Sequence, residues 1–274
     1  MPTWRSDRIA ANGLRIHYTR TGGDKPPLVL AHGFSDDGLC WTLVAEALAP
    51  DYDVVMVDAR GHGRSDGPAE GYALTDMAAD LAGVITELRL HRPAILGHSM
   101  GGATTFVLAG AYPELPGAIL IEDAGMLNLA APATPEGQER AARMRAWIIE
   151  LKRMTRNEMI AHARLQSPAW PEAELGPWAD AKLRFSLNAL SRIGAAVVDW
   201  QTILSTIRCP ALLITADPER GAMVDADGAA SIRALVPQLK VAHIAGAGHN
   251  IRREQFDRYL EVVCGFLTEA YDGR

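Results

Sequence analysis

The feature that most restricts the fold of this chain is the segment 97–101, which reads Gly-His-Ser-Met-Gly. It directly follows an apolar run at 93–96 and precedes a helix-like segment at 103–112. A strand that turns sharply into a helix forces its central residue into a strained backbone conformation, and glycines two positions away let the chains approach closely. The pattern therefore predicts a strand–turn–helix that exposes the hydroxyl of Ser99, the candidate nucleophile.

Short apolar runs alternate with helix-like stretches along most of the chain. The runs lie at 28–31, 54–57, 94–96, 118–121, 211–214 and 241–244. Runs without polar alternation are typical of strands that helices cover on both faces. The sequence therefore predicts an α/β fold with a mostly parallel sheet.

The alternation stops near Asp123, and the stretch 126–205 reads as helices separated by proline-containing turns. It holds four of the six tryptophans, which are Trp147, Trp170, Trp178 and Trp200. A helical insertion over the carboxyl edge of a parallel sheet would form a lid. We therefore expect a core domain of residues 1–125 and 206–274, with residues 126–205 inserted as a cap that lines an apolar pocket.

The charge and cysteine content exclude several classes of protein. The formal net charge of −6 provides no basic field for nucleic acid or anionic membranes. No apolar run approaches the roughly 18 residues of a membrane helix, and the N-terminus lacks a secretory apolar region. The three cysteines, Cys40, Cys209 and Cys264, have neither disulfide nor metal-ligand spacing. We expect a cytoplasmic monomer or homodimer with no metal and no cofactor.

A serine nucleophile needs a general base, and the best candidate is His249 in the segment 246–250, Gly-Ala-Gly-His-Asn. This glycine-rich loop follows the last predicted strand. The base in turn needs a carboxylate to orient it. We favour Asp217, which directly follows the run at 211–214, while Asp123 and Glu219 remain alternatives.

Attack on an ester or amide creates an oxyanion, so two backbone N–H donors are expected. Met100 follows the nucleophile and opens the helix, and Phe34 lies in the loop after the first buried strand. We predict these two residues as the oxyanion hole, with His32 holding the loop structurally. The neighbouring Asp36 and Asp37 are more readily interpreted as helix caps than as substrate contacts.

Four segments resemble the α/β-hydrolase superfamily: 32–34, 58–66, 97–102 and 246–249. The resemblance spans nearly the whole chain, and the order of serine, acid and histidine is that of the superfamily. It implies an eight-stranded, mostly parallel sheet flanked by helices, with a cap at the position of the helical stretch. Fold-level resemblance does not identify the substrate.

The leading hypothesis is a cofactor-independent serine hydrolase that cleaves a carboxylic ester or lactone through an acyl-enzyme. The apolar cap favours a substrate with an acyl or aromatic arm, and acyl-homoserine lactones fit that description. A carbon–carbon bond hydrolase of ring-cleavage products is the alternative. It would need cap cations for the substrate carboxylate, drawn from Arg143, Arg145, Arg184 and Arg192. A haloperoxidase or perhydrolase activity and a ligand-sensing receptor are less favoured.

Overall fold

A single eight-stranded sheet forms the centre of the computed structural model, which describes residues 4–125, 135–192 and 198–272. The strands are β1 (Arg5–Ala11), β2 (Leu14–Arg20), β3 (Pro27–Ala31), β4 (Asp53–Val57), β5 (Ala94–His98), β6 (Ala118–Glu122), β7 (Ala211–Thr215) and β8 (Leu239–His243). Their order is β1-β2-β4-β3-β5-β6-β7-β8. The hairpin β1–β2 and the pair β2–β4 are antiparallel, and the other neighbours are parallel. The predicted α/β fold with a mostly parallel sheet is confirmed.

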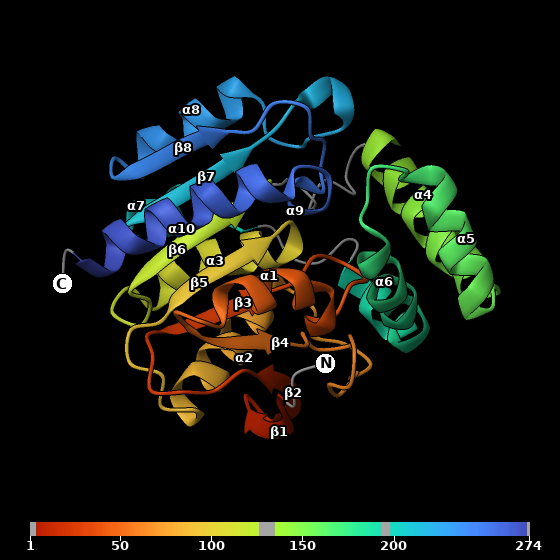
Figure 1. The fold of residues 1–274 in the computed structure, drawn as a ribbon, viewed down its shortest axis with the longest axis horizontal. Coiled ribbons are helices and arrows are strands. Elements are labelled where there is room, and N and C mark those ends of the chain that lie inside the picture. Colours follow the sequence, from red (N-terminus) through yellow and green to blue (C-terminus); the bar gives the residue numbers. More distant parts are fainter. Residues whose placement is uncertain (1–3, 126–134, 193–197, 273–274) are drawn as a thin grey trace.

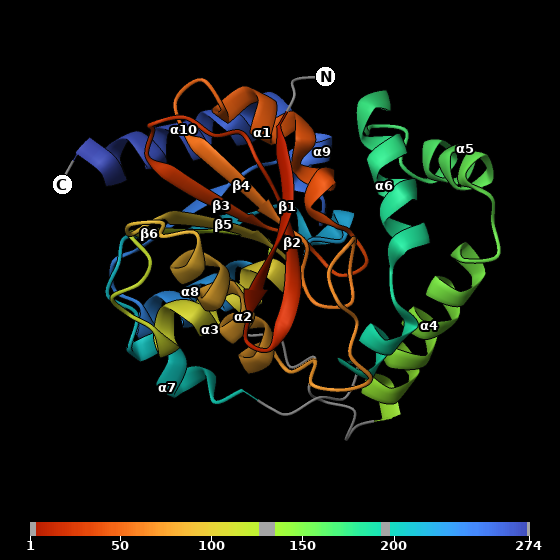
Figure 2. The ribbon, with the colours of Figure 1, turned by 90° about the horizontal axis from the view of Figure 1, so that it is seen from below.

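Helices cover both faces of this sheet (Figures 1 and 2). The helices packed on one face are α1 (Thr42–Leu48), α9 (Ile251–Glu254) and α10 (Phe256–Asp272). Those on the other face are α2 (Leu74–Glu87), α3 (Met100–Ala111), α7 (Trp200–Ser205) and α8 (Ala226–Leu235). Two short 3₁₀ turns, η1 (Gly38–Trp41) and η3 (Pro218–Arg220), follow β3 and β7. Because both faces are covered, strands β4 to β7 are buried along their whole length.

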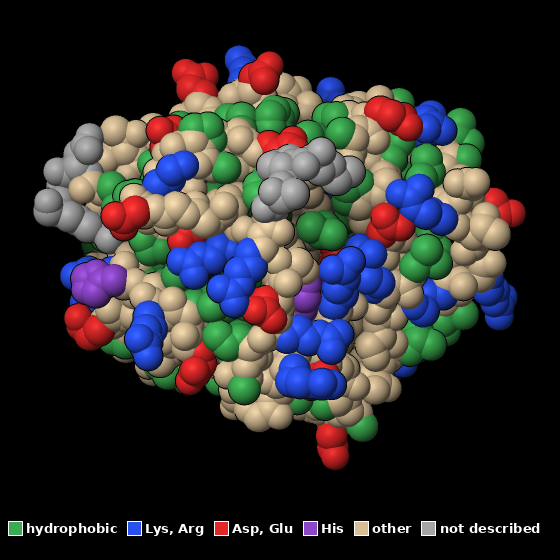
Figure 3. Space-filling view, turned by 60° about the horizontal axis from the view of Figure 1, so that its bottom comes forward, with side chains coloured by type: hydrophobic (Ala, Val, Ile, Leu, Met, Phe, Trp, Pro, Cys, Tyr) green, Lys and Arg blue, Asp and Glu red, His purple; other side chains and the backbone are tan. Residues whose placement is uncertain are grey.

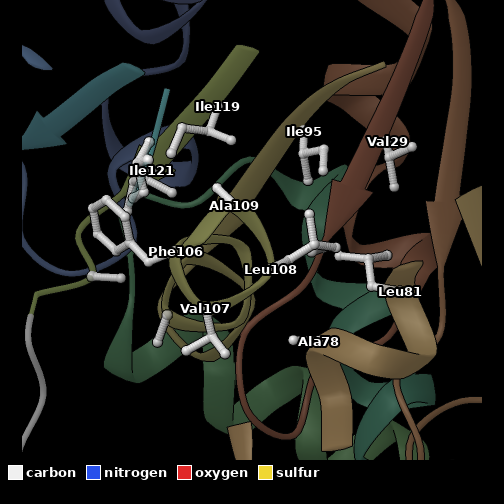
Figure 4. Packing of buried hydrophobic residues seen from close by; sticks show 14 of the residues in the cluster. Val29, Ala78, Leu81, Ile95, Phe106, Val107, Leu108, Ala109, Ile119 and Ile121 are labelled. Carbon is white, nitrogen blue, oxygen red and sulfur yellow. The ribbon is translucent and has the colours of Figure 1, made fainter. Parts of the chain in front are cut away.

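Helix α3 is the most deeply buried helix and lies directly behind the nucleophile segment. Figure 4 shows its Phe106 beside Ile121 of β6 and its Leu108 beside Leu81 of α2, all within one cluster of buried apolar side chains. A helix that is apolar on all sides is stable only in a protein interior. Burying side chains of this size stabilises the fold by roughly 1.5–3 kcal/mol each. The first turn of α3 is therefore held on a rigid platform.

A separate helical layer stands over the carboxyl edge of the sheet (Figure 1). It consists of α4 (Pro135–Leu151), α5 (Arg156–Gln166), α6 (Glu172–Arg184) and the 3₁₀ turn η2 (Leu187–Arg192), which we call the cap. Helix α7 also falls within the stretch 126–205, yet its Trp200 and Leu204 belong to the main core beside α3. Among the described residues, the helical layer that stands apart from the sheet therefore ends before α7.

Strand β1 forms one edge of the sheet, and most of its residues are exposed. Charged side chains such as Arg5, Asp7 and Arg8 line it, which discourages pairing with another chain.

Figure 3 shows the face that carries this hairpin, on which basic and acidic side chains are interspersed. Within the described ranges, no helix is long and apolar enough to cross a membrane.

Candidate active site

The nucleophile segment has the strained geometry that its sequence predicts. Ser99 joins β5 to α3 with φ 50° and ψ −112°, a backbone conformation that non-glycine residues rarely adopt. A Cβ on Gly97 would lie 2.4 Å from the Gly101 carbonyl oxygen, and one on Gly101 would lie 2.1 Å from the carbonyl oxygen of Ala31. Only glycine fits at these two positions, and the resulting tight turn leaves Ser99 half-buried at the end of β5.

His249 is paired with a carboxylate, and that carboxylate is Asp123. The Nδ1 atom of His249 lies 2.7 Å from Oδ2 of Asp123, which is fully buried. The carboxylate also accepts the N–H groups of Met223 and Val224, at 2.8–3.0 Å. Asp123 follows β6 with φ 42°. Backbone donors and a strained conformation therefore hold this side chain in one orientation against the imidazole.

The pairing that we expected between Asp217 and His249 is not found in the structure. Asp217 follows β7 as predicted, but its Oδ1 atom lies 3.0 Å from Nε2 of His243 and its Oδ2 atom accepts the Gly246 N–H at 2.7 Å. Glu219 is exposed in η3. Of the three candidates, Asp123 pairs with His249, and it directly follows β6, the strand adjacent to β5.

One feature of the sequence does favour Asp123, since an acidic residue directly follows the apolar run at 118–121. Strand β6 lies between β5 and β7, so a residue at its carboxyl end stands beside the nucleophile turn. The Glu122 carbonyl accepts the Ser99 N–H at 3.0 Å, which ties the two strand ends together. An acidic residue directly after this apolar strand was visible in the sequence, but the neighbourhood of β5 and β6 was not.

The segment 33–36 forms a turn beside Ser99, which we call the oxyanion turn after the role that the sequence predicts for it. The Asp36 N–H donates to the Gly33 carbonyl at 3.2 Å, and a Cβ on Gly33 would lie 3.5 Å from Cβ of Ser99. Phe34 is the first central residue of this turn, and Ser35 has φ 65°. The Met100 N–H lies in the first turn of α3, where N–H groups have no intrahelical acceptor. Gly33, the residue before Phe34, and Met100 therefore both border Ser99, and the oxyanion hole of Phe34 and Met100 stays a prediction.

His32 fixes the start of the oxyanion turn, in agreement with its expected structural role. Its Nδ1 atom donates to the Gly33 carbonyl at 2.8 Å, and its Nε2 atom accepts the Ala59 N–H at 3.0 Å. Both ring nitrogens are thus engaged, so the imidazole connects the turn to the loop after β4.

His98, the residue before Ser99, contacts His249 in a way that the sequence did not suggest. Its ring centroid is 4.7 Å from that of His249, and its Nε2 atom donates to the His249 carbonyl at 3.0 Å. Burial lowers the pKa of His98 well below its usual range, and the nearby Arg252 guanidinium lowers it further. His98 is therefore neutral, with the proton on Nε2.

Apolar side chains from the core and the cap meet over the oxyanion turn. The rings of Phe34 and Phe185 pack edge to face with centroids 5.2 Å apart. Their neighbours in this cluster include Tyr72, Met100, Trp147, Ile148 and Leu190. A cavity of about 30 Å³ adjoins Met100 and is also lined by Asp58, Arg60 and Asp80. The apolar cluster therefore supplies a hydrophobic wall beside the turn.

The cap arginines that we considered for a carboxylate subsite have other contacts. Arg184 pairs with Asp37 at 2.6 Å, and Arg143 pairs with Glu139 on the surface. Arg145 is exposed and lies 3.5 Å from the Leu190 carbonyl. The side chain of Arg192 lies outside the described residues. In the described part of the chain, no group of three or more His, Cys, Asp and Glu side chains is placed to hold a metal.

The sequence also shows to which family of proteins this chain belongs. The sequence matches the family model described as the alpha/beta hydrolase family over residues 28–262. The chain is an alpha/beta hydrolase. The eight-stranded, mostly parallel sheet with flanking helices that we inferred from the resemblance is therefore confirmed.

Individual relatives of this alpha/beta hydrolase differ in the reactions that they are named for. The N-formylmaleamate deformylase of Pseudomonas putida is 29% identical over 266 residues, which cover 94% of this chain and 95% of that protein. A crystal structure of an N-formylmaleamic acid deformylase from the same species has a TM-score of 0.79 at 26% identity, covering 94% of this chain and 100% of that one. An N-acyl homoserine lactone degrading enzyme has a TM-score of 0.76 at 25% identity, covering 94% and 99%.

Proposed function

We propose that this alpha/beta hydrolase is a cofactor-independent serine hydrolase that cleaves a carboxylic ester or lactone through an acyl-enzyme. The observation that carries the proposal is the buried Asp123 carboxylate 2.7 Å from Nδ1 of His249, beside a serine on a strained turn. A carboxylate in this position keeps the proton on Nδ1, so that Nε2 is free to act as a base. This arrangement is the one that an inert hydroxyl needs to become a nucleophile.

In the proposed mechanism, Ser99 Oγ attacks the substrate carbonyl carbon while its proton moves to Nε2 of His249. Asp123 stabilises the imidazolium that forms. The carbonyl oxygen becomes an oxyanion that accepts hydrogen bonds from the N–H groups of Phe34 and Met100. Collapse of this intermediate breaks the bond to the leaving oxygen, which takes the proton from His249 and departs as an alcohol.

Hydrolysis of the acyl-enzyme repeats these steps with water. His249 removes a proton from the water as its oxygen attacks the acyl carbon, and the second tetrahedral intermediate is held by the same two N–H groups. When it collapses, Ser99 Oγ leaves as the alcohol after receiving the proton from His249. The products are a carboxylic acid and the regenerated enzyme.

The apolar cluster of Phe34, Phe185, Trp147 and Ile148 supports a substrate with an apolar acyl or aromatic arm. The similarity to an enzyme named for N-acyl homoserine lactones is compatible with that arm. The similarity to a deformylase supports amides of small acids as a further substrate class. Carbon–carbon bond hydrolysis remains the second candidate, because the same nucleophile and base serve it.

The test is a hydrolysis panel on the wild type and the variant Ser99→Ala. The panel holds nitrophenyl esters from acetate to dodecanoate, acyl-homoserine lactones, N-formylmaleamate and a ring-cleavage dienoate. Ester or lactone turnover that Ser99→Ala abolishes is expected. Turnover of the dienoate alone would favour carbon–carbon hydrolysis, and binding without any turnover would favour a receptor.

A further inference from the structure

Six charged side chains are buried together between the core and the cap, and we call them the Asp36 cluster. They are Asp36, Glu122, Glu174, Lys182, Arg252 and Arg253, each with a side chain no more than 5% exposed. The cluster balances three carboxylates against three cations. A buried charge without a partner is strongly destabilising, so each member depends on the others.

Asp36 is the centre of this cluster. Its Oδ1 atom is 2.7 Å from Nζ of Lys182, while its Oδ2 atom is 2.9 Å from Arg253 and 3.4 Å from Arg252. Burial disfavours the ionised carboxyl, but the three cations outweigh it and hold the pKa of Asp36 well below its usual range. Asp36 is thus an anion that three cations fix in place, rather than the helix cap that we expected.

Asp36 is also the last residue of the oxyanion turn, so the cluster acts directly on that turn. The ammonium group of Lys182 donates to the Ser35 carbonyl at 3.0 Å as well as to the Asp36 carboxylate. It therefore holds both the second central residue and the final residue of the turn. The Ser35 carbonyl shares a peptide plane with the Asp36 N–H, which donates to the Gly33 carbonyl at 3.2 Å. The Gly33 carbonyl in turn shares a peptide plane with the Phe34 N–H, so the contacts of Lys182 act on the orientation of that donor.

Lys182 comes from the cap, since it lies near the end of α6. At the start of the same helix, Glu174 accepts a hydrogen bond from Arg253 at 2.8 Å. Arg253 lies four residues after His249 in the chain. Helix α6 is thus anchored at one end to the oxyanion turn and at the other to the segment that carries the base. A helix held in this way is a fixed wall of the site.

From these contacts we propose that Lys182 is a positioning residue, which reaches down from the cap and holds the oxyanion turn in its working geometry. The inference rests on the proposed serine mechanism, because only an oxyanion makes use of the Phe34 donor. It assigns to cap helix α6 a part in catalysis that is independent of any contact with substrate.

The test compares Lys182→Met with the wild type on the best neutral nitrophenyl ester and on a trifluoromethyl ketone of the same acyl chain. Such a ketone adds to a serine nucleophile and places an oxyanion in the hole, as the transition state does. We expect kcat/KM to fall about 10- to 100-fold, and the inhibition constant of the ketone to rise by a similar factor. KM should stay close to the wild-type value, because ground-state contacts are retained.

Arg184→Met is the matched control. Arg184 lies on the same helix, and its removal changes the charge of the cap equally, but its partner Asp37 caps η1 by accepting the Leu39 N–H. In both variants the cap should be less stable, but only Lys182→Met should bind the ketone more weakly. A loss of ketone affinity that is equal in both variants, or absent in Lys182→Met, would overturn the inference.

A second variant covers the case in which Lys182→Met does not fold. Lys182→Arg keeps the buried cation, but a planar guanidinium directs its donors in one plane and cannot keep the geometry of a single ammonium nitrogen that donates to both acceptors. We expect a folded protein with a smaller but parallel loss in kcat and in ketone affinity. Unchanged ketone affinity in this variant would contradict the inference. Absence of turnover and of ketone binding in the wild type would instead overturn the proposed function, and this inference with it.

Discussion

His249 and Asp123 are 126 residues apart in the chain, yet their side chains form a 2.7 Å contact at the carboxyl edge of the sheet. The contact joins the loop after β8 to the end of β6, across the end of β7. Met223 and Val224, in the loop after β7, donate to the same carboxylate. The last three parallel strands thus all contribute to holding one carboxylate.

The first prediction separates the two candidate acids. Asp123→Asn should lower kcat by about 10⁴-fold, because an amide stabilises neither the required tautomer nor the imidazolium. Asp217→Asn should leave kcat near the wild-type value, since its partners are His243 and the Gly246 N–H. Steady-state kinetics on a nitrophenyl ester would measure both. The reverse pattern would assign the acid to Asp217, as the sequence alone suggested.

The second prediction concerns the pH dependence of stability. The pKa of fully buried His98 is lowered, first by burial, so the unfolded chain binds a proton that the folded chain does not. The contribution of His98 to stability is therefore complete above about pH 6.5 and is lost as the pH falls below that value. The loss approaches about 1.4 kcal/mol per pH unit.

His98→Gln tests this dependence, because glutamine can still donate to the His249 carbonyl but does not titrate. Urea unfolding at several pH values between about 7 and 5 would measure the free energy of unfolding of both proteins. The variant should lose less stability than the wild type over this range. Parallel curves for the two proteins would show that His98 titrates normally.

The third prediction concerns the close backbone contacts at the nucleophile turn. Gly97→Ala should destabilise the fold by at least about 1–3 kcal/mol, because its Cβ would overlap the Gly101 carbonyl oxygen. Gly265→Ala is the control, since nothing lies within 4 Å of a Cβ at that position in α10. In this control, alanine should stabilise the helix by roughly 0.5–1 kcal/mol. Thermal and urea unfolding would reveal the opposite signs, and equal effects would be inconsistent with the close approach.

The fourth prediction concerns the strain stored at Ser99. Ser99→Ala and Ser99→Gly should both abolish hydrolysis, because each removes the nucleophilic hydroxyl. Glycine tolerates φ 50° whereas alanine does not, so Ser99→Gly should be more stable than Ser99→Ala by about 1 kcal/mol. The free energies of unfolding of the two inactive variants provide the comparison. A more stable alanine variant would show that the turn is not strained.

Local patterns were sufficient for much of the fold and for part of the site. The apolar runs of β3 to β7 have no polar alternation, and each is buried on both faces of the sheet. The glycines at 97 and 101 predicted the turn at Ser99, because backbone proximity leaves room for no other residue. These features depend on residues that are close together in the chain, so the sequence is sufficient to predict them.

The partners of the buried charges could not be predicted in this way. Asp36 was interpreted as a cap for the next helix, but it meets Lys182 from 146 residues later and Arg253 from 217 residues later. Nothing near any of the three residues in the sequence indicates such a contact. Their pairing depends on where the cap helix α6 lies on the core.

By itself, the sequence therefore determined the alternation of strands and helices, the strained turn at Ser99 and the position of His249 after the last strand. Only the tertiary structure decided that Asp123 rather than Asp217 meets His249, and that Lys182 holds the oxyanion turn. The physical reason is that a hydrogen bond requires two groups to lie within about 3 Å of each other. For residues more than a hundred positions apart, the lateral order of the strands and the docking of the cap establish that distance, and local sequence does not encode either one.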